Sequence, residues 1–248
     1  MGGACSIDFI MAFWYYFTVM AEQLLEQSIA YEEMLKAGMH FGRKKTVFHP
    51  AMDRYVFTVR DGICIIDLIK TQVQLRNTIE ALRKIVKDGG LILFVALTKQ
   101  SIESTKDLAE ALSMPYVLDR WLGGTLTNFK VLHSRVSKLE EMERQQKTSE
   151  LDKYTKKERL LFNREIKKMG TKFEGLKKLI KMPDLVFVTS LKESALPVRE
   201  AKRMGVKVAA ISNTDANPDE VNYVVPANDR SKKSVDLIIQ TIKKELTE

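Results

Sequence analysis

Residues 130–181 combine dense charge with a regular apolar stripe, and few folds accommodate both. In the second half of this segment apolar residues recur every three or four positions, at Phe162, Ile166, Met169, Phe173, Leu176 and Ile180. This spacing predicts the seam of a helix that packs lengthwise on a second helix. A shorter stripe precedes it, at Leu132, Val136, Leu139 and Met142, before a polar stretch at residues 145–151. We therefore predict an inserted, protruding α-helical coiled-coil hairpin, whose second helix at residues 156–181 would extend roughly 39 Å from a compact body.

The positive charge of the chain is concentrated in the same segment. The whole chain has 40 Lys+Arg and 32 Asp+Glu, a net charge of +8 and a pI of about 9.3. Residues 130–181 contain 16 of the basic and 8 of the acidic residues, so the remainder is balanced at 24 of each. A charged helix face can simply be solvated. An excess confined to one arm nevertheless favours a polyanionic partner, above all a nucleic acid.

The sequence RWLGGTLTNF at residues 120–129 joins the predicted hairpin to the rest of the chain. Gly123 and Gly124 permit backbone angles and close approaches that a side chain would block. Trp121 and Phe129 supply apolar anchors on either side, and we interpret Trp121 as a packing residue rather than a platform for base stacking. The stretch therefore predicts a rigid joint that aims the arm.

Outside the hairpin, apolar strands alternate with amphipathic helices. After an opening helix at residues 24–36, residues 55–59 and 63–68 predict a β-hairpin around an Asp61-Gly62 turn. Further strands are predicted at residues 91–97, 116–118, 185–188, 206–211 and 223–225, and helices at residues 71–87, 101–112, 195–204 and 232–246. Such repeated units predict an α/β fold, a three-layer domain with a mainly parallel sheet flanked by helices. The body would comprise residues 20–129 and 182–248, with residues 130–181 as an insertion.

The first nineteen residues require a separate interpretation. An apolar run at residues 9–20 is too short to span a bilayer comfortably, and it follows Asp8 rather than a basic residue. We interpret residues 1–19 as an over-extended N-terminus with translation starting at Met20, and the alternative is a membrane-surface anchor. Cys5 and Cys64 lack the paired spacing of a zinc or redox centre, which favours a reducing cytosolic setting.

Patterns typical of catalysis are missing from the sequence. It has no ATPase-type phosphate-binding loop, no dinucleotide fingerprint and no nucleophile elbow. His40, His49 and His133 are too scattered to indicate a metal set or a catalytic triad. The polar cluster at residues 212–218 follows a predicted strand, where an enzyme acting on a nucleotide or sugar phosphate would have its crevice. The same residue types also form ordinary turns and helix caps. We favour that structural interpretation and predict no enzyme activity, cofactor, metal or small-molecule substrate.

Six separated motifs resemble, in the same order, those of the bacterial-type S2 family of the small ribosomal subunit. They are AGMHFG with HPAM at residues 37–42 and 49–52, IIDLIKT at residues 65–71, RWLGGTLTNF at residues 120–129, PDL at residues 183–185, DANP at residues 215–218 and PAND at residues 226–229. The resemblance implies an α/β body with a protruding coiled-coil hairpin, placed between head and body of the small ribosomal subunit, in the cytoplasm or an organelle. It also implies contact with ribosomal RNA and neighbouring ribosomal proteins, help in docking the mRNA-binding S1 protein where one exists, and no catalysis.

One departure from the family pattern lies in the glycine-bracketed loop at residues 38–45, which Gly38 and Gly42 are expected to shape. The family commonly has a second histidine directly after the Phe-Gly pair, and this chain has Arg43. A metal site that used that histidine is not expected, whereas the extra cation favours phosphate binding. We predict RNA contacts at His40, Arg43, Lys44, Lys45, Arg54, Arg230, Lys232 and Lys233. The alternative to an RNA-binding function is a coiled-coil scaffold whose arm binds protein alone.

Overall fold

A computed structural model describes residues 29–148 and 155–247 of the chain. The predictions for residues 1–19, for the first part of the opening helix and for the tip of the hairpin lie outside the described residues. The described part of the opening helix is α2 (Tyr31–Lys36). In the part of the chain that is described, no helix has both the length and the apolar character needed to cross a membrane.

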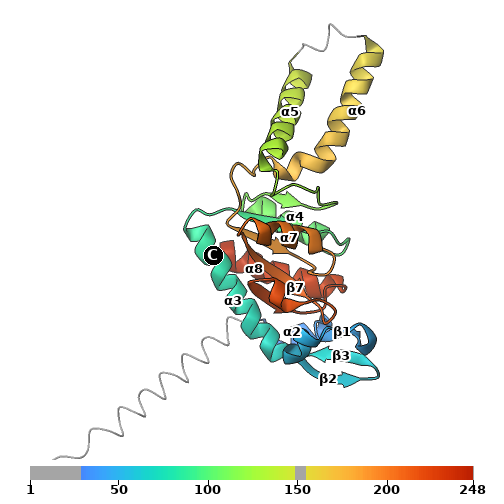
Figure 1. The fold of residues 1–248 in the computed structure, drawn as a ribbon, viewed down its shortest axis with the longest axis vertical. Coiled ribbons are helices and arrows are strands. Elements are labelled where there is room, and N and C mark those ends of the chain that lie inside the picture. Colours follow the sequence, from blue (N-terminus) through green and yellow to red (C-terminus); the bar gives the residue numbers. More distant parts are fainter. Residues whose placement is uncertain (1–28, 149–154, 248) are drawn as a thin grey trace, which may run out of the picture.

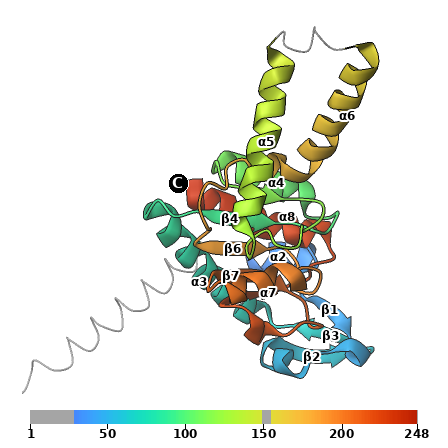
Figure 2. The same ribbon diagram turned by 45° about the horizontal axis from the view of Figure 1, so that its top comes forward.

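A five-stranded parallel sheet forms the centre of the body (Figures 1 and 2). Its strands are β4 (Ile92–Val95), β5 (Tyr116–Val117), β6 (Leu185–Val188), β7 (Lys207–Ser212) and β8 (Tyr223–Pro226), in the order β5-β4-β6-β7-β8. Every residue of β4 and β6 is buried, as expected for central parallel strands covered on both faces. The predicted parallel sheet is confirmed.

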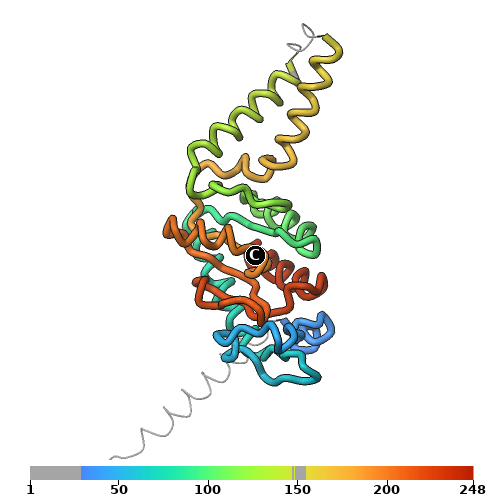
Figure 3. The backbone as a smooth tube through the Cα atoms, turned by 45° about the vertical axis from the view of Figure 1, so that its right-hand side comes forward, coloured from blue at the N-terminus to red at the C-terminus, as the bar shows by residue number. Residues whose placement is uncertain are grey.

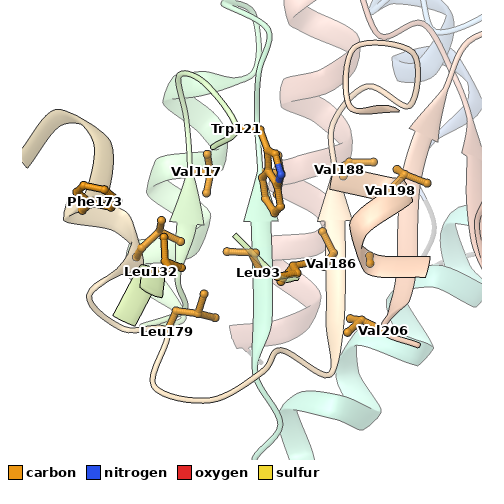
Figure 4. Packing of buried hydrophobic residues seen from close by; sticks show 14 of the residues in the cluster. Leu93, Val117, Trp121, Leu132, Phe173, Leu179, Val186, Val188, Val198 and Val206 are labelled. Atoms are coloured by element: carbon orange, nitrogen blue, oxygen red, sulfur yellow. The ribbon is translucent and has the colours of Figure 1, made fainter. Parts of the chain in front are cut away.

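Helices cover both faces of this sheet. One face is covered by α2 together with α3 (Leu68–Lys87), α4 (Ile102–Ala111) and α8 (Lys232–Thr247). The other face is covered by α7 (Ala195–Arg203). Successive residues of β4 point to opposite faces: Ile92 and Phe94 pack with the four helices of the first face, while Leu93 and Val95 pack on the side of Trp121. Figure 4 shows Trp121 at the centre of this second cluster. The three-layer α/β architecture is as predicted.

A second, smaller sheet lies at one end of the body. It contains β1 (Phe41–Lys44), β2 (Val56–Arg60) and β3 (Ile63–Ile66), antiparallel and in the order β1-β3-β2. The predicted hairpin of β2 and β3 is confirmed, with positive φ at both Asp61 and Gly62 in the turn. The prediction of a loop at residues 38–45 is wrong over β1. A strand forms here because Gly42 allows β1 to pair closely with β3. A Cβ atom at Gly42 would lie 2.7 Å from the Cys64 carbonyl oxygen.

The charged segment forms two helices, α5 (Phe129–Lys147) and α6 (Lys156–Phe173). They project from the end of the body opposite the small sheet (Figures 1 and 3). The predicted stripe residues of α5 are buried, at Leu132, Val136, Leu139 and Met142, as are Ile166 and Phe173 of α6. Gln146 Nε2 donates to Asn163 Oδ1 across the pair at 3.0 Å. The two packed helices agree with the prediction, and their supercoiling as a coiled coil stays a prediction.

The second helix of the arm is shorter than predicted. α6 ends at Phe173, a single 3-10 turn (Glu174–Leu176) follows, and Ile180 is 76% exposed rather than part of the seam. The chain bends because Gly175 lies against β5, where a Cβ atom would come within 2.3 Å of the Tyr116 carbonyl oxygen. Leu176 and Leu179 then enter the core of the body. The 18 residues of α6 span about 27 Å.

Candidate nucleic-acid interface

The loops that follow β6, β7 and β8 meet at the carboxyl-terminal edge of the parallel sheet. Asp229, which is 2% exposed, accepts hydrogen bonds from Ser190 Oγ at 2.6 Å and from Asn213 Nδ2 at 2.9 Å. Asn213 in turn accepts from the Thr214 backbone N–H at 2.8 Å, and Asn217 caps a short 3-10 helix (Pro218–Glu220). These side chains are engaged in holding the loops together, so the structural interpretation of residues 212–218 agrees with the contacts.

The small sheet is attached to this edge through β1. The Arg43 backbone N–H donates to Thr214 Oγ1 at 2.8 Å, and the His49 backbone N–H donates to the Thr214 carbonyl oxygen at 2.9 Å. Gly42 makes the approach possible, because a Cβ atom there would lie 2.8 Å from Thr214 Cγ2. Gly38, with a φ of 72°, turns the chain from α2 into β1. These contacts are consistent with a shaping role of Gly38 and Gly42, and that role stays a prediction.

The cations of the segment differ in how far their charge is available. Arg43 is half-buried, and its Nε lies 3.4 Å from Asp215 Oδ2. Lys44 and Lys45 are exposed and have no carboxylate within 4.0 Å among the described residues. Lys192, which the sequence analysis did not single out, lines the same cavity of about 380 Å³ as Arg43 and Lys44. The structure thus gathers two predicted cations, Arg43 and Lys44, and the unexpected Lys192 around one cavity.

Arg54 lies on a 3-10 helix (Pro50–Tyr55) that precedes β2. Its guanidinium donates to Asp219 Oδ1 at 2.6 Å and lies 5.1 Å from the centre of the Tyr55 ring. The hydrogen bond with Asp219 is the main cause of a raised pKa for Arg54. This cation is therefore held by its own chain and is partly neutralised.

The predicted cations at and just before the start of the C-terminal helix lie beside the turn at Gly38. The Asn228 backbone N–H donates to the Met39 carbonyl oxygen at 3.2 Å, which places the start of α8 against this turn. Arg230 pairs with Glu193 at 2.9 Å and Lys232 pairs with Glu103 at 2.6 Å. The Glu103 partner raises the pKa of Lys232. Lys233 is exposed and has no carboxylate within 4.0 Å in the described part of the chain.

His40 is half-buried, and its ring lies tilted against a neighbouring ring. Its ring centroid lies 4.0 Å from that of Phe41, and its Nδ1 is buried without a hydrogen-bond partner in the described residues. Burial lowers the pKa of His40 below its ordinary value, because the charged form loses hydration. Burial thus favours the neutral form of the ring. A contact of His40 with RNA stays a prediction.

The joint at residues 120–129 is organised by a buried carboxylate that sequence analysis missed. Glu200 of α7, 7% exposed, accepts from Trp121 Nε1 at 3.0 Å and from the Gly124 N–H at 2.9 Å. Its other oxygen accepts from the N–H groups of Leu126 at 3.1 Å and Thr127 at 3.3 Å. Burial alone would raise the pKa of Glu200, but these hydrogen bonds outweigh it and hold the pKa below its ordinary value.

Three residues predicted to support the joint are Trp121, Gly124 and Phe129, and their roles stay predictions. Gly124 has a φ of 89°, which a residue with a side chain adopts at a cost, and Trp121 is 5% exposed within the core. Phe129, at the start of α5, packs against the same core cluster. Gly123 is different, because no atom lies within 4 Å of the position that its Cβ would occupy.

Comparison with known proteins decides the family. The family model described as ribosomal protein S2 matches residues 34–248. The chain belongs to the ribosomal protein S2 family. It is similar to proteins named small ribosomal subunit protein uS2: in Fusobacterium nucleatum, 39% identity over 89% of this chain and 90% of the relative, and in Thermus thermophilus, 39% identity over 85% and 82%. In Dehalococcoides mccartyi the identity is 40%, over 84% of each chain.

Membership of the S2 family shows that the chain is not an enzyme, since the family consists of ribosomal proteins. Arg43, which replaces the histidine common in the family, has a defined neighbour in this S2 chain. The Arg43 guanidinium faces Asp215, so a cationic side chain fills the space beside that carboxylate. Among the residues that the structure describes, no group of three or more His, Cys, Asp or Glu side chains is arranged to hold a metal ion.

Proposed function

We propose that the chain binds ribosomal RNA between head and body of the small ribosomal subunit and so supports translation. As an S2-family protein it is a structural constituent of that subunit. The observation that carries the RNA part of the proposal is the charge distribution, since the whole net charge of +8 falls in residues 130–181. A ribosomal partner that is mostly polyanion matches this distribution.

In this proposal the unpaired cations of the body supply the phosphate contacts of the body. Lys44 and Lys45 at β1 and Lys233 on α8 are exposed and have no carboxylate partner among the described residues. The other predicted cations already pair with carboxylates of the chain, so they would contact phosphates less strongly. They are Arg43, Arg54, Arg230 and Lys232. Contacts of this kind follow the backbone and shape of RNA rather than its base sequence.

The proposal extends to protein neighbours. By its resemblance to the family, the chain would contact adjacent small-subunit proteins and would help to dock the mRNA-binding S1 protein in an organism that has one. The body of residues 20–129 and 182–248 would carry the RNA contacts of Lys44, Lys45 and Lys233. The arm of residues 130–181 would brace the body against the surrounding subunit.

Sedimentation of a tagged chain from a cell lysate tests this function. We expect co-migration with small ribosomal subunits at moderate salt and a smaller bound fraction at high salt, because phosphate contacts release counterions on binding. Treatment with ribonuclease should release the chain. Migration as a free protein at both salt concentrations would contradict the proposal, and ribonuclease-resistant binding to one protein would favour a scaffold that binds protein alone.

A further inference from the structure

A groove opens between α5 and α6 at the base of the arm. Its volume is about 690 Å³, and residues of both helices and of the joint line it. The floor is apolar, formed by Leu122, Leu132, Met169 and Phe173. Val131, which is 47% exposed, extends this apolar surface toward solvent. The groove is separate from the cations of the body, which lie near the opposite end of the molecule (Figure 1).

The walls of the groove are strongly basic. Arg135 and Lys138 come from α5, and Lys168 and Lys172 come from α6. Glu165 is the acidic residue of this lining, and it pairs with Lys138 at 3.9 Å. Arg135, Lys168 and Lys172 are exposed and have no carboxylate within 4.0 Å in the described ranges. Three uncompensated cations therefore surround one apolar floor.

Gly123 keeps one end of the groove open. It lines the groove, its φ is not positive, and a Cβ atom there would meet no atom within 4 Å. Neither backbone conformation nor internal packing therefore requires a glycine at this position. A larger side chain would project into unoccupied space at the joint. The small residue is explained if another molecule approaches the backbone here.

We propose that this groove binds the phosphodiester backbone of RNA. The three cations meet phosphates on both walls, and the apolar floor receives the less polar faces of the riboses. An acidic protein segment is a poorer match, because the cations are spread over two helices, α5 and α6, rather than along one helical stripe. The inference rests on the proposed function and adds to it a contact site at the end of the molecule remote from Lys44 and Lys45.

Rebinding to depleted small subunits tests the inference. The probe is a small subunit from which the resident S2-family protein has been removed, and the variant combines Arg135→Ala, Lys168→Ala and Lys172→Ala. The matched control, Lys156→Ala with Lys157→Ala and Lys167→Ala, removes the same charge from α6 outside the groove. We expect the groove variant to need roughly tenfold more protein for half-saturation. Its salt slope should fall by about 2, because each phosphate that the variant no longer neutralises lowers the slope by about 0.7 to 0.9. For the control variant, the protein concentration at half-saturation should change by less than about threefold.

A photoreactive benzophenone amino acid at Val131 identifies the occupant in the same complex. We expect an adduct with RNA. An adduct with protein, or equal rebinding by the groove variant and its control, would overturn the inference while leaving the function intact. Failure of the unmodified chain to rebind would instead overturn the function and the inference together. Because all six substituted cations are exposed, circular dichroism should show unchanged folding in both variants.

Discussion

At the scale of single residues, Glu200 holds the joint by accepting hydrogen bonds from four residues of the segment 121–127. Replacing it by alanine leaves buried N–H groups without acceptors, each at a cost of about 1 to 3 kcal/mol. We expect Glu200→Ala to lower the free energy of unfolding by about 3 kcal/mol or more in urea denaturation. Lys202→Ala, at an exposed position of the same helix, is the control. Equal stability of the two variants would show that the carboxylate does not hold the joint.

The same carboxylate gives a pH dependence with a defined sign. Because the pKa of Glu200 is lower in the folded chain than its ordinary value of 4.5, its stabilisation is fully present above that value. As the pH falls below about 4.5, the unfolded chain takes up the proton first, and stability is lost until the folded carboxyl also titrates. Urea unfolding between pH 7 and pH 3.5 should therefore show the advantage of the native chain over Glu200→Gln shrinking in acid. A constant difference would contradict this.

Sequence reasoning at this scale finds exposed cations but not their partners. Lys44 and Lys45 could be predicted as surface residues from the charge pattern alone. The pairs Arg54–Asp219 and Arg43–Asp215 join residues far apart in the chain, and no local pattern indicates which carboxylate a fold brings near. Glu200 was missed for the same reason. On α7 it is one acidic residue among several charged ones, and only the packing of the joint onto that helix shows that it is buried.

At the scale of elements, two glycines of the arm should respond oppositely to alanine. Gly170 lies inside α6 with nothing within 4 Å of a Cβ position, so Gly170→Ala should raise the free energy of unfolding by about 0.5 to 1 kcal/mol. Gly175→Ala forces a contact of 2.3 Å with the Tyr116 carbonyl oxygen and should lower it by about 3 kcal/mol. Urea denaturation of both variants checks the signs. A stabilising Gly175→Ala would show that the chain does not bend against β5.

The same glycines mark where the sequence predicts elements well and where it does not. Apolar periodicity identified both helices of the arm, because the period of 3.6 residues persists over several turns. It did not locate the end of α6, since the apolar spacing continues past Phe173 into residues that enter the core. β1 was missed because its glycine indicates a loop, while the reason for that glycine is a strand contact between Gly42 and Cys64.

At the scale of the whole molecule, positive charge lies in two separate regions, with the groove at the base of the arm, Lys44 and Lys45 at the small sheet, and Lys233 near the start of α8. Figure 3 shows the arm and the small sheet at opposite ends of the tube. A partner that engages both ends must be extended and anionic along its length, which suits folded RNA better than one compact protein. The six motifs implied, as a family resemblance, an α/β body with a protruding hairpin. The hairpin position and the α/β body followed independently from periodicity, because local patterns repeat over long segments.

The body cations give a last prediction, which separates free charge from paired charge. Substitution of Lys44, Lys45 and Lys233 by alanine should weaken binding to depleted small subunits and reduce the salt slope by about 2, since each free cation displaces counterions from a phosphate. Substitution of Arg54, Arg230 and Lys232 removes the same charge but also frees the carboxylates of Asp219, Glu193 and Glu103. If these cations stay paired in the complex, the slope should change by less than about 1, although the freed carboxylates would still repel RNA. Measuring half-saturation at several salt concentrations distinguishes a change of slope from a uniform loss of affinity. Equal slopes for the two variants would mean that the internal ion pairs open on binding and that all six cations contact phosphate.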